Sequence, residues 1–442
     1  MNKSDYIIQK VNKLLSLRRA IVLSVILILG NILSRFILVV AAFYIIYLFC
    51  SQNDIENYYL GLFLIPNIRI LDAFGVTYIV NLLLAVPLVI YVMRKNYKFD
   101  RTVLFGWLFL LIWEGFHIAV FENYSNLPNE LSMFLGMLYC ITITLNEYHE
   151  LNCKNAWNFF AFGIIVSGIS YLFSHPSYLN GMVANIVMGY RFSGYAGEPN
   201  YYSLYICLAL SMIFTFKKYS IYNYCAMFIL IIFGLMTASK MCVLLMLFTL
   251  IIGFIDCAKK IKYQSKKGFI IFGILMLIIG GVLFKNQIAV LAQNFIKRAG
   301  LSDNNLDFER ITSGRSSIFS EYISILSNDF LGLIFGKGLQ YHLFFNSGGY
   351  GSHNTYLDAV LAWGGIGFIV LISIIAYWRN NIISRLKVKK TFSIPILILG
   401  INFLDLSCLS ATMFWWVLSL SFLSLYNNAD FIEEQCTECS YC

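Results

Sequence analysis

Apolar runs long enough to cross a membrane recur along the whole chain, and they constrain its fold more than any other feature. A helix needs about 20 largely apolar residues to cross roughly 30 Å of hydrocarbon, and such runs recur between residues 20 and 426. Hydrophobic residues make up 59% of the 442 residues and charged residues only 12%, whereas soluble domains carry about 25% charged residues. So little charge cannot cover a water-exposed surface of this size. The sequence therefore predicts an all-α polytopic integral membrane protein and excludes a soluble enzyme.

We expect a single membrane domain over residues 1–442 with about 12 transmembrane helices, the first of them one long or bent helix. The expected spans lie near 20–49, 75–93, 102–121, 128–145, 156–173, 199–216, 220–237, 241–256, 268–284, 353–377, 392–407 and 409–426. Two long outer segments remain, a first outer loop at 174–198 and a large outer loop at 285–352. The second precedes the last three spans and is too long to be a mere connector, so we expect it to be structured.

The basic residues set the orientation of these spans. Lys and Arg concentrate in cytoplasmic connections, and basic clusters at 3–19, 94–101, 259–267 and 379–390 fall in alternate connections. This alternation predicts that both termini are cytoplasmic, and the first run lacks a cleavage site and should remain as an anchor. The formal charge of +9 is then explained by topology and by anionic lipid, so we expect no nucleic-acid partner.

A minority of the basic residues lie against this rule, on the expected outer side. They are Arg69, Arg191, Lys240, Lys285, Lys297, Arg298, Arg310, Arg315 and Lys337, while Arg35 falls inside the first expected span. An anionic ligand at the outer membrane face is the simplest reason to keep cations there.

The first outer loop ends in the motif Arg191-Phe-Ser-Gly-Tyr-Ala-Gly-Glu198-Pro-Asn200. Gly and Pro predict a tight entry into the following helix, which places Glu198 and Asn200 at its N-terminus. For Asn200, a polar helix cap and a ligand contact are equally good interpretations. The turn Thr237-Ala-Ser-Lys240 leaves two more alternatives open, because Lys240 either extends to the interface or binds an anion.

The large outer loop carries Arg310, Arg315 and Lys337 and ends in Ser352-His353-Asn354-Thr355-Tyr356, directly before an apolar span. His353 therefore opens a helix that faces outward. An unperturbed histidine titrates near pH 6.5 and accepts a proton from a hydroxyl. We expect no metal site, because the acidic residues of the outer loops are scattered and the C-terminal tail offers only three cysteines where structural zinc needs four ligands.

Taken in order, these motifs resemble the bacterial O-antigen ligase and O-antigen polymerase superfamily. The similarity covers about residues 60–425 and includes Arg-x-x-Gly with Glu-Pro-Asn, the small-Ser-Lys turn, Ser313-Gly-Arg-Ser316 with a later Gly-Lys-Gly, and Ser-His-Asn-x-Tyr-Leu. The large outer loop before the last three spans also resembles the GT-C-like architecture of that family. The family usually has Arg where this chain has Lys240, which replaces a fork-shaped donor by a point charge.

The resemblance implies a metal-independent glycosyltransferase without a cofactor, in the bacterial inner membrane. It would transfer a glycan from a polyprenyl-pyrophosphate carrier to a hydroxyl at the outer face. The residues that the resemblance makes catalytic are His353, Arg191 and Arg315. Those that it assigns to substrate binding are Glu198, Asn200, Lys240, Arg310, Lys337, Asn354 and Tyr356.

Within this chemistry we favour a polymerase that joins lipid-linked repeat units of an O-antigen or a capsule. A ligase that hands the polymer to a lipid A-core or to a protein is the nearest alternative. A flippase or exporter of the same lipids is the alternative from another class, and it would need charges inside the membrane, for which Arg35 and Glu114 are the main candidates. Expected partners are the lipid-linked oligosaccharide, membrane lipid, a flippase and a chain-length regulator.

Overall fold

The computed structural model describes residues 3–74, 81–94, 99–122, 124, 127–176, 191–216, 219–259, 293, 315–344, 351–386, 393–411 and 413–426. Within these ranges the chain forms 15 α-helices, two short 3-10 helices and no strand, so the prediction of an all-α fold is confirmed for this part of the chain. The span expected at 268–284 lies outside the described residues, as do much of both outer loops and Arg310.

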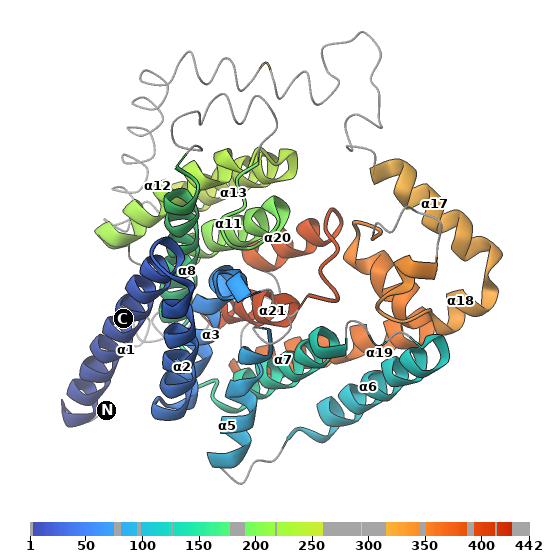
Figure 1. Cartoon of the computed structure of the whole chain (residues 1–442), viewed down its shortest axis with the longest axis horizontal. Helices are drawn as coiled ribbons and strands as arrows, with labels where there is room; N and C mark the ends of the chain where they lie inside the picture. Colours follow the sequence, from blue (N-terminus) through green and yellow to red (C-terminus); the bar gives the residue numbers. More distant parts are fainter. Residues whose placement is uncertain are drawn as a thin grey trace, which may run out of the picture.

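In the described part of the chain, three helices are long and apolar enough to cross a membrane: α6 (Arg101–Phe121), α8 (Cys153–Ser174) and α19 (Thr355–Leu386). Shorter apolar helices accompany them, namely α2 (Arg35–Ser51), α5 (Val86–Arg94), α12 (Ile221–Met236), α13 (Lys240–Lys259), α20 (Ile394–Phe403) and α21 (Met413–Leu423). Together they indicate a multi-pass membrane protein. In Figure 1, α1 (Lys3–Ile32) and α2 stand on one side, α6 stands on the other, and α21 lies between them.

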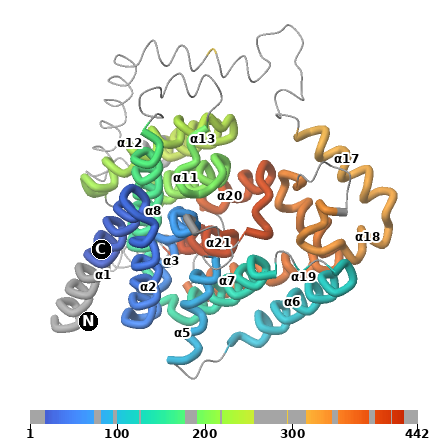
Figure 2. Tube along the Cα trace, viewed as in Figure 1, coloured from blue at the N-terminus to red at the C-terminus, as the bar shows by residue number. Residues whose placement is uncertain are grey.

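The first expected span, 20–49, differs in the structure. It is divided between α1 and α2, which pack side by side as a helical hairpin (Figure 2). Ser34 ends the run because its hydroxyl caps α2 by accepting a hydrogen bond from the Phe36 amide at 3.3 Å. Arg35 is therefore the exposed first residue of α2 at the hairpin turn, and it is not a charge in the middle of a span.

The end of the hairpin meets the end of α5. Arg94, the last residue of α5, donates hydrogen bonds to the carbonyl oxygens of Phe49 (3.2 Å), Cys50 and Gln52. A cation at the C-terminus of a helix satisfies the carbonyl groups that lack a partner within the helix. The chain then runs through α3 (Asp54–Leu64) and the 3-10 helix η1 (Ile65–Phe74). Two helices, α1 and α2, thus replace one expected span, and α3 and η1 form a helical segment where the sequence predicted no span.

The centre of the bundle is formed by α21, α3, α7 (Leu127–Asn146), α8 and α11 (Pro199–Ile213). Every residue of α21 is buried, so this helix faces protein on all sides. Trp416 stacks on Tyr58 with ring centroids 5.6 Å apart, and Tyr58 shares a hydrogen bond of 2.7 Å with Ser419. This core fixes α11, which carries part of the candidate site at its N-terminus.

The long helix α19 is interrupted at Gly364, whose φ of 65° and ψ of −176° are not helical. The segment after the short helix α18 (Phe330–Phe335) occupies the break. Its Lys337 and Gly338 amides donate to the carbonyl oxygens of Leu361 and Ala362, at 2.9 and 2.7 Å. Unpaired backbone groups are costly in a membrane, so the segment Gly336–Gln340, which we call the strap, stabilises the break.

The break predicts that alanine destabilises the protein at Gly364 but not at the adjacent Gly365. A Cβ on Gly364 would stand 2.1 Å from the carbonyl oxygen of Ile334, in a backbone region open essentially to glycine alone. We expect Gly364→Ala to cost at least about 1–3 kcal/mol from backbone strain and to lower the Tm of the purified protein. Gly365→Ala is the matched control, because its Cβ would meet only the Leu333 carbonyl oxygen at 3.6 Å. Equal Tm values for the two variants would contradict this description of the break.

Candidate functional site

The candidate site lies where the starts of α11, α17 (Arg315–Asn328) and α19 meet the loop that follows α20. Four residues expected to act on the ligand approach this point from distant parts of the sequence: Arg191, Glu198, Arg315 and His353. In Figure 1, α11 and α20 lie next to each other above α21. Residues 191–200 and 237–240 form one half of the site, and residues 315, 351–358 and 405–408 form the other.

The loop before α11 is held in place at both ends of its glycine turn. The Phe192 amide donates to the Met236 carbonyl oxygen at 3.2 Å, and the Tyr195 amide donates to Ser167 Oγ at 2.7 Å. Gly194 and Gly197 have φ values of 50° and 86°, a conformation that glycine adopts at least cost. The sequence motif thus builds a fixed loop against α8 and α12.

This loop brings Arg191 and Asn200 together. Arg191 Nη2 donates to Asn200 Oδ1 at 2.6 Å, and its Nε donates to the Thr237 carbonyl oxygen at 3.1 Å. Asn200 Nδ2 in turn donates to Glu198 Oε1 at 2.8 Å. Asn200 therefore connects a cation with an anion rather than capping its helix, and Glu198 occupies the cap position without a side-chain cap bond.

The turn between α12 and α13 completes this half. Ala238 has a φ of 49°, and Ser239 Oγ lies 3.4 Å from Asn200 Oδ1. Lys240 follows directly as the first, half-buried residue of α13. Lys240 thus directly follows Ser239, whose side chain contacts Asn200.

Arg69 joins this half, and the sequence motifs did not identify it. A Cβ on Gly197 would stand 2.1 Å from Cζ of Arg69, so the arginine approaches the loop only because residue 197 is glycine. Within the described residues, Arg69 makes no hydrogen bond or ion pair, and it is exposed. The only signal in the sequence was its position against the rule for basic residues.

In the second half, Arg315 is paired with Asp405. Its Nη1 forms an ion pair with the carboxylate and donates to the Asp405 carbonyl oxygen at 2.9 Å. Both side chains are about a quarter exposed, 21% and 25%, so the pair remains accessible from solvent. Asp405 belongs to the loop between α20 and α21, which the sequence reasoning did not include in the site.

His353 has a left-handed backbone, with a φ of 54°. Such strain in a residue other than glycine persists only where the surroundings impose it. The Ser352 amide donates to Tyr341 Oη at 3.0 Å, and Ser352 Oγ donates to Asp358 Oδ1 at 2.5 Å. Tyr341 Oη also donates to the same carboxylate oxygen. The side chains of Tyr341 and Asp358 thus fix Ser352, the residue that precedes His353.

Burial lowers the pKa of His353, and the nearby positive charge of Arg315 lowers it further, while Glu198 and Asp405 oppose the shift. A histidine with a pKa below about 6.5 is neutral at pH 7, which leaves a ring nitrogen able to accept a proton. The influence of Glu198 also shows that the two halves are close to each other. Tyr201 of α11 links them directly by donating to the Ser407 carbonyl oxygen at 2.7 Å.

Three other predicted ligand residues have structural partners. Asn354 Oδ1 caps α19 by accepting from the amides of Tyr356 and Leu357, at 3.0 Å each. The Tyr356 hydroxyl donates to the Gly400 carbonyl oxygen of α20 at 3.1 Å. Lys337 Nζ pairs with Asp329 Oδ2 at 2.7 Å beside α18. None of these contacts connects to Arg191, Arg315 or His353.

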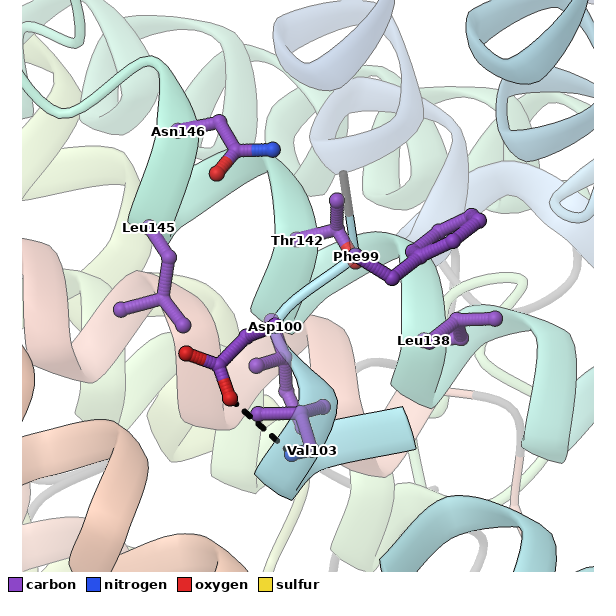
Figure 3. Close-up of a pocket in the computed structure, with 8 residues that line it drawn as sticks. Phe99, Asp100, Val103, Leu138, Thr142, Leu145 and Asn146 are labelled. Carbon is purple, nitrogen blue, oxygen red and sulfur yellow. Dashed lines mark hydrogen bonds between the residues drawn. The ribbon is translucent and has the colours of Figure 1, made fainter. Parts of the chain in front are cut away.

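Figure 3 shows a small pocket that does not belong to this site. It is formed by residues at the start of α6 and the end of α7, including Asp100, Val103 and Asn146. Asp100 accepts hydrogen bonds from the amides of Thr102 and Val103 and from the Tyr377 hydroxyl. Tyr377 lies near the opposite end of α19 from His353. The pocket contains none of the predicted site residues.

Among the residues that the structure covers, no group of three or more His, Cys, Asp or Glu side chains could hold a metal ion. No protein-family model and no curated protein matches the chain. The fold and the site therefore define a class only: a multi-pass, all-helical membrane protein that gathers arginines and one neutral histidine at one end of its bundle.

The electrostatic contact between Arg315 and His353 predicts the direction of a pKa change. Arg315→Gln removes a positive charge and frees the Asp405 carboxylate, and both effects favour the protonated imidazole. We expect the pKa of His353 to rise, as measured by NMR titration of histidine-labelled protein with the signal assigned through His353→Gln. Arg385→Gln is the control, because Arg385 lies over the Tyr148 ring away from the site. A pKa that falls or stays constant in Arg315→Gln would reject the contact.

Proposed function

We propose that this protein is a glycosyltransferase of the polymerase type at the outer face of the bacterial inner membrane. It transfers a growing glycan from a polyprenyl-pyrophosphate carrier to a sugar hydroxyl of another lipid-linked repeat unit, for an O-antigen or a capsule. The observation that carries the proposal is the convergence of Arg69, Arg191 and Arg315 with a neutral His353 at one end of the bundle.

The arginines match the needs of the leaving group. When the bond between the anomeric carbon and the phosphate oxygen breaks, negative charge develops on the pyrophosphate. Guanidinium groups donate paired hydrogen bonds to phosphate oxygens. Arg191 is positioned by Asn200 and Thr237, and the exposed Arg69 lies beside the same loop. These two cations bind the pyrophosphate in our proposal.

His353 acts on the acceptor. Its neutral imidazole takes the proton of the acceptor hydroxyl while the hydroxyl oxygen forms the new glycosidic bond. The lowered pKa keeps it in the basic form at neutral pH. Arg315 contributes twice, because it lowers the pKa of His353 and places a cation next to the reacting groups. The proton remains on His353 until solvent removes it, and the carrier pyrophosphate departs.

A ligase would use the same groups, and the acceptor alone separates the two activities. A flippase is less well supported. Arg35 is exposed at a helix start, and Glu114 is buried, with its carboxylate accepting from Trp363 Nε1 at 2.7 Å and from the Leu339 amide at 3.0 Å. Neither residue provides a charge that lines a transport cavity. The expected partners therefore remain a lipid-linked repeat unit, a separate flippase and a chain-length regulator.

The role of His353 is tested with purified protein and lipid-linked repeat units, with chain length scored on a gel. A general base contributes about a hundredfold to ten-thousandfold in rate, so His353→Ala should nearly stop chain extension. His353→Gln keeps a hydrogen-bonding side chain but accepts no proton, and it should fail to a similar degree. His342→Gln, which changes a half-buried histidine of the same outer loop, should leave the ladder unchanged. Wild-type ladders from His353→Ala would exclude His353 from the reaction.

The anion-binding role of Arg191 predicts a graded series. Arg191→Ala should abolish long polymer at an unchanged protein level, because the phosphate loses a fork-shaped donor. Arg191→Lys should restore only part of the activity, since a compact charge cannot donate in the same paired geometry. Arg35→Ala, at the exposed hairpin turn, serves as the arginine control. Long polymer made by Arg191→Ala would refute the assignment.

A further inference from the structure

The short helix α18 exposes an apolar face. Phe330 is 70% exposed and Leu331 is 66% exposed, and Leu333 and Phe335 are exposed as well. By sequence this helix belongs to the large outer loop, where water would surround it. A contiguous apolar face of this kind marks a contact with another molecule or with a membrane.

Two spans independently place α18 at the depth of the outer leaflet. The strap pairs with Leu361 and Ala362 of α19, six and seven residues after the helix start at Thr355, which corresponds to about 10 Å at 1.5 Å per residue. On α6, Trp113 Nε1 and His117 Nε2 lie 3.2 and 2.9 Å from the Phe335 carbonyl oxygen. These residues precede the end of α6 at Phe121 by about 6 to 12 Å. One hydrocarbon leaflet is about 15 Å thick.

The exposed face of α18 continues the exposed face of α6. Phe335 packs on Trp113 with ring centroids 6.0 Å apart, and Trp113 packs on Phe116 at 6.3 Å. Phe116 and Ile112 of α6 are 55% and 69% exposed, as expected for residues of a membrane-length helix that contact lipid. The two helices thus present one continuous apolar surface.

The irregular backbone that follows α18 has hydrogen-bond partners within the protein, as a membrane requires. Irregular backbone at membrane depth is tolerated only where protein covers it. Gly336 and Gly338 are buried, the Gly336 amide donates to Gly332 at 2.9 Å, and the next two amides donate to α19. The charged residues at the two ends of α18, Asp329 and Lys337, neutralise each other at 2.7 Å.

We propose that α18 is a re-entrant helix whose Phe330 and Leu331 face contacts the acyl chains of membrane phospholipid in the outer leaflet. Part of the loop 285–352 then lies inside the membrane rather than outside it. The re-entrant helix anchors the strap, and the strap leads directly into Tyr341, which holds Ser352 beside His353. The proposal does not depend on the glycosyltransferase activity.

Photocrosslinking of the full-length protein tests it. A benzoyl-phenylalanine at position 330 or at position 331 replaces one large apolar side chain by another, in proteoliposomes of phosphatidylethanolamine and phosphatidylglycerol. After irradiation, mass spectrometry of the peptide should show phospholipid adducts at both positions. The same probe at Ser327, an exposed polar residue three positions before the start of α18, should give at least tenfold fewer adducts.

Two positions keep the test interpretable, because a folding defect at one leaves the other. Lipid adducts at Phe330 or Leu331 well above the Ser327 level support the proposal. Adducts no more frequent than at Ser327 overturn it, as does a crosslink to a second copy of the chain as the main product. Because the readout needs no substrate, the proposal and the glycosyltransferase activity succeed or fail separately.

Discussion

The candidate site depends on the pairing between the break in α19 and the strap that fills it. A membrane offers no water to the carbonyl oxygens that Gly364 leaves without helical partners, so the amides of Lys337 and Gly338 must supply their hydrogen bonds. This requirement fixes the strap, and the strap fixes Tyr341, whose hydroxyl holds both Ser352 and Asp358. The strained backbone of His353 lies directly after Ser352. Its position is therefore set by hydrogen bonds inside the bundle rather than by a free loop.

The arginines of the site differ in whether they have a partner within the protein. Arg315 has Asp405, and Arg191 is linked to Glu198 through the amide of Asn200. Arg69 makes no such contact within the described residues. A phosphate that enters beside Arg69 meets a cation without an ion pair among the described residues, whereas beside Arg315 it competes with the Asp405 carboxylate. An anion is thereby favoured near residue 69 more than near residue 315.

The sequence predicted the helices well where their length alone defines them, as for α6, α8 and α19, because an apolar run of this length has one stable form in a membrane. It missed the hairpin within 20–49, since the turn at Leu33 and Ser34 contains neither Gly nor Pro and the apolar pattern continues across it. The contact between Arg191 and Asn200 could be predicted from the sequence, because both residues flank one glycine turn. The sequence could not predict the contributions of Arg69, Tyr341 and Asp405, because they depend on contacts between residues far apart in the sequence. Asn354 and Tyr356 stand in the motif, but their side chains serve α19 and α20.

The two buried glutamates Glu114 and Glu130 have structural partners that do not favour a role in transport. Glu114 accepts from the Leu339 amide and from Trp363, and Glu130 accepts from Gln340 Nε2 at 3.0 Å. Both carboxylates thus hold the strap, one on α6 and the other on α7. A transporter would need such groups to exchange partners as it changes state. Here they join the strap to α6 and α7, which suits the glycosyltransferase that we propose, because its histidine must stay at a constant depth.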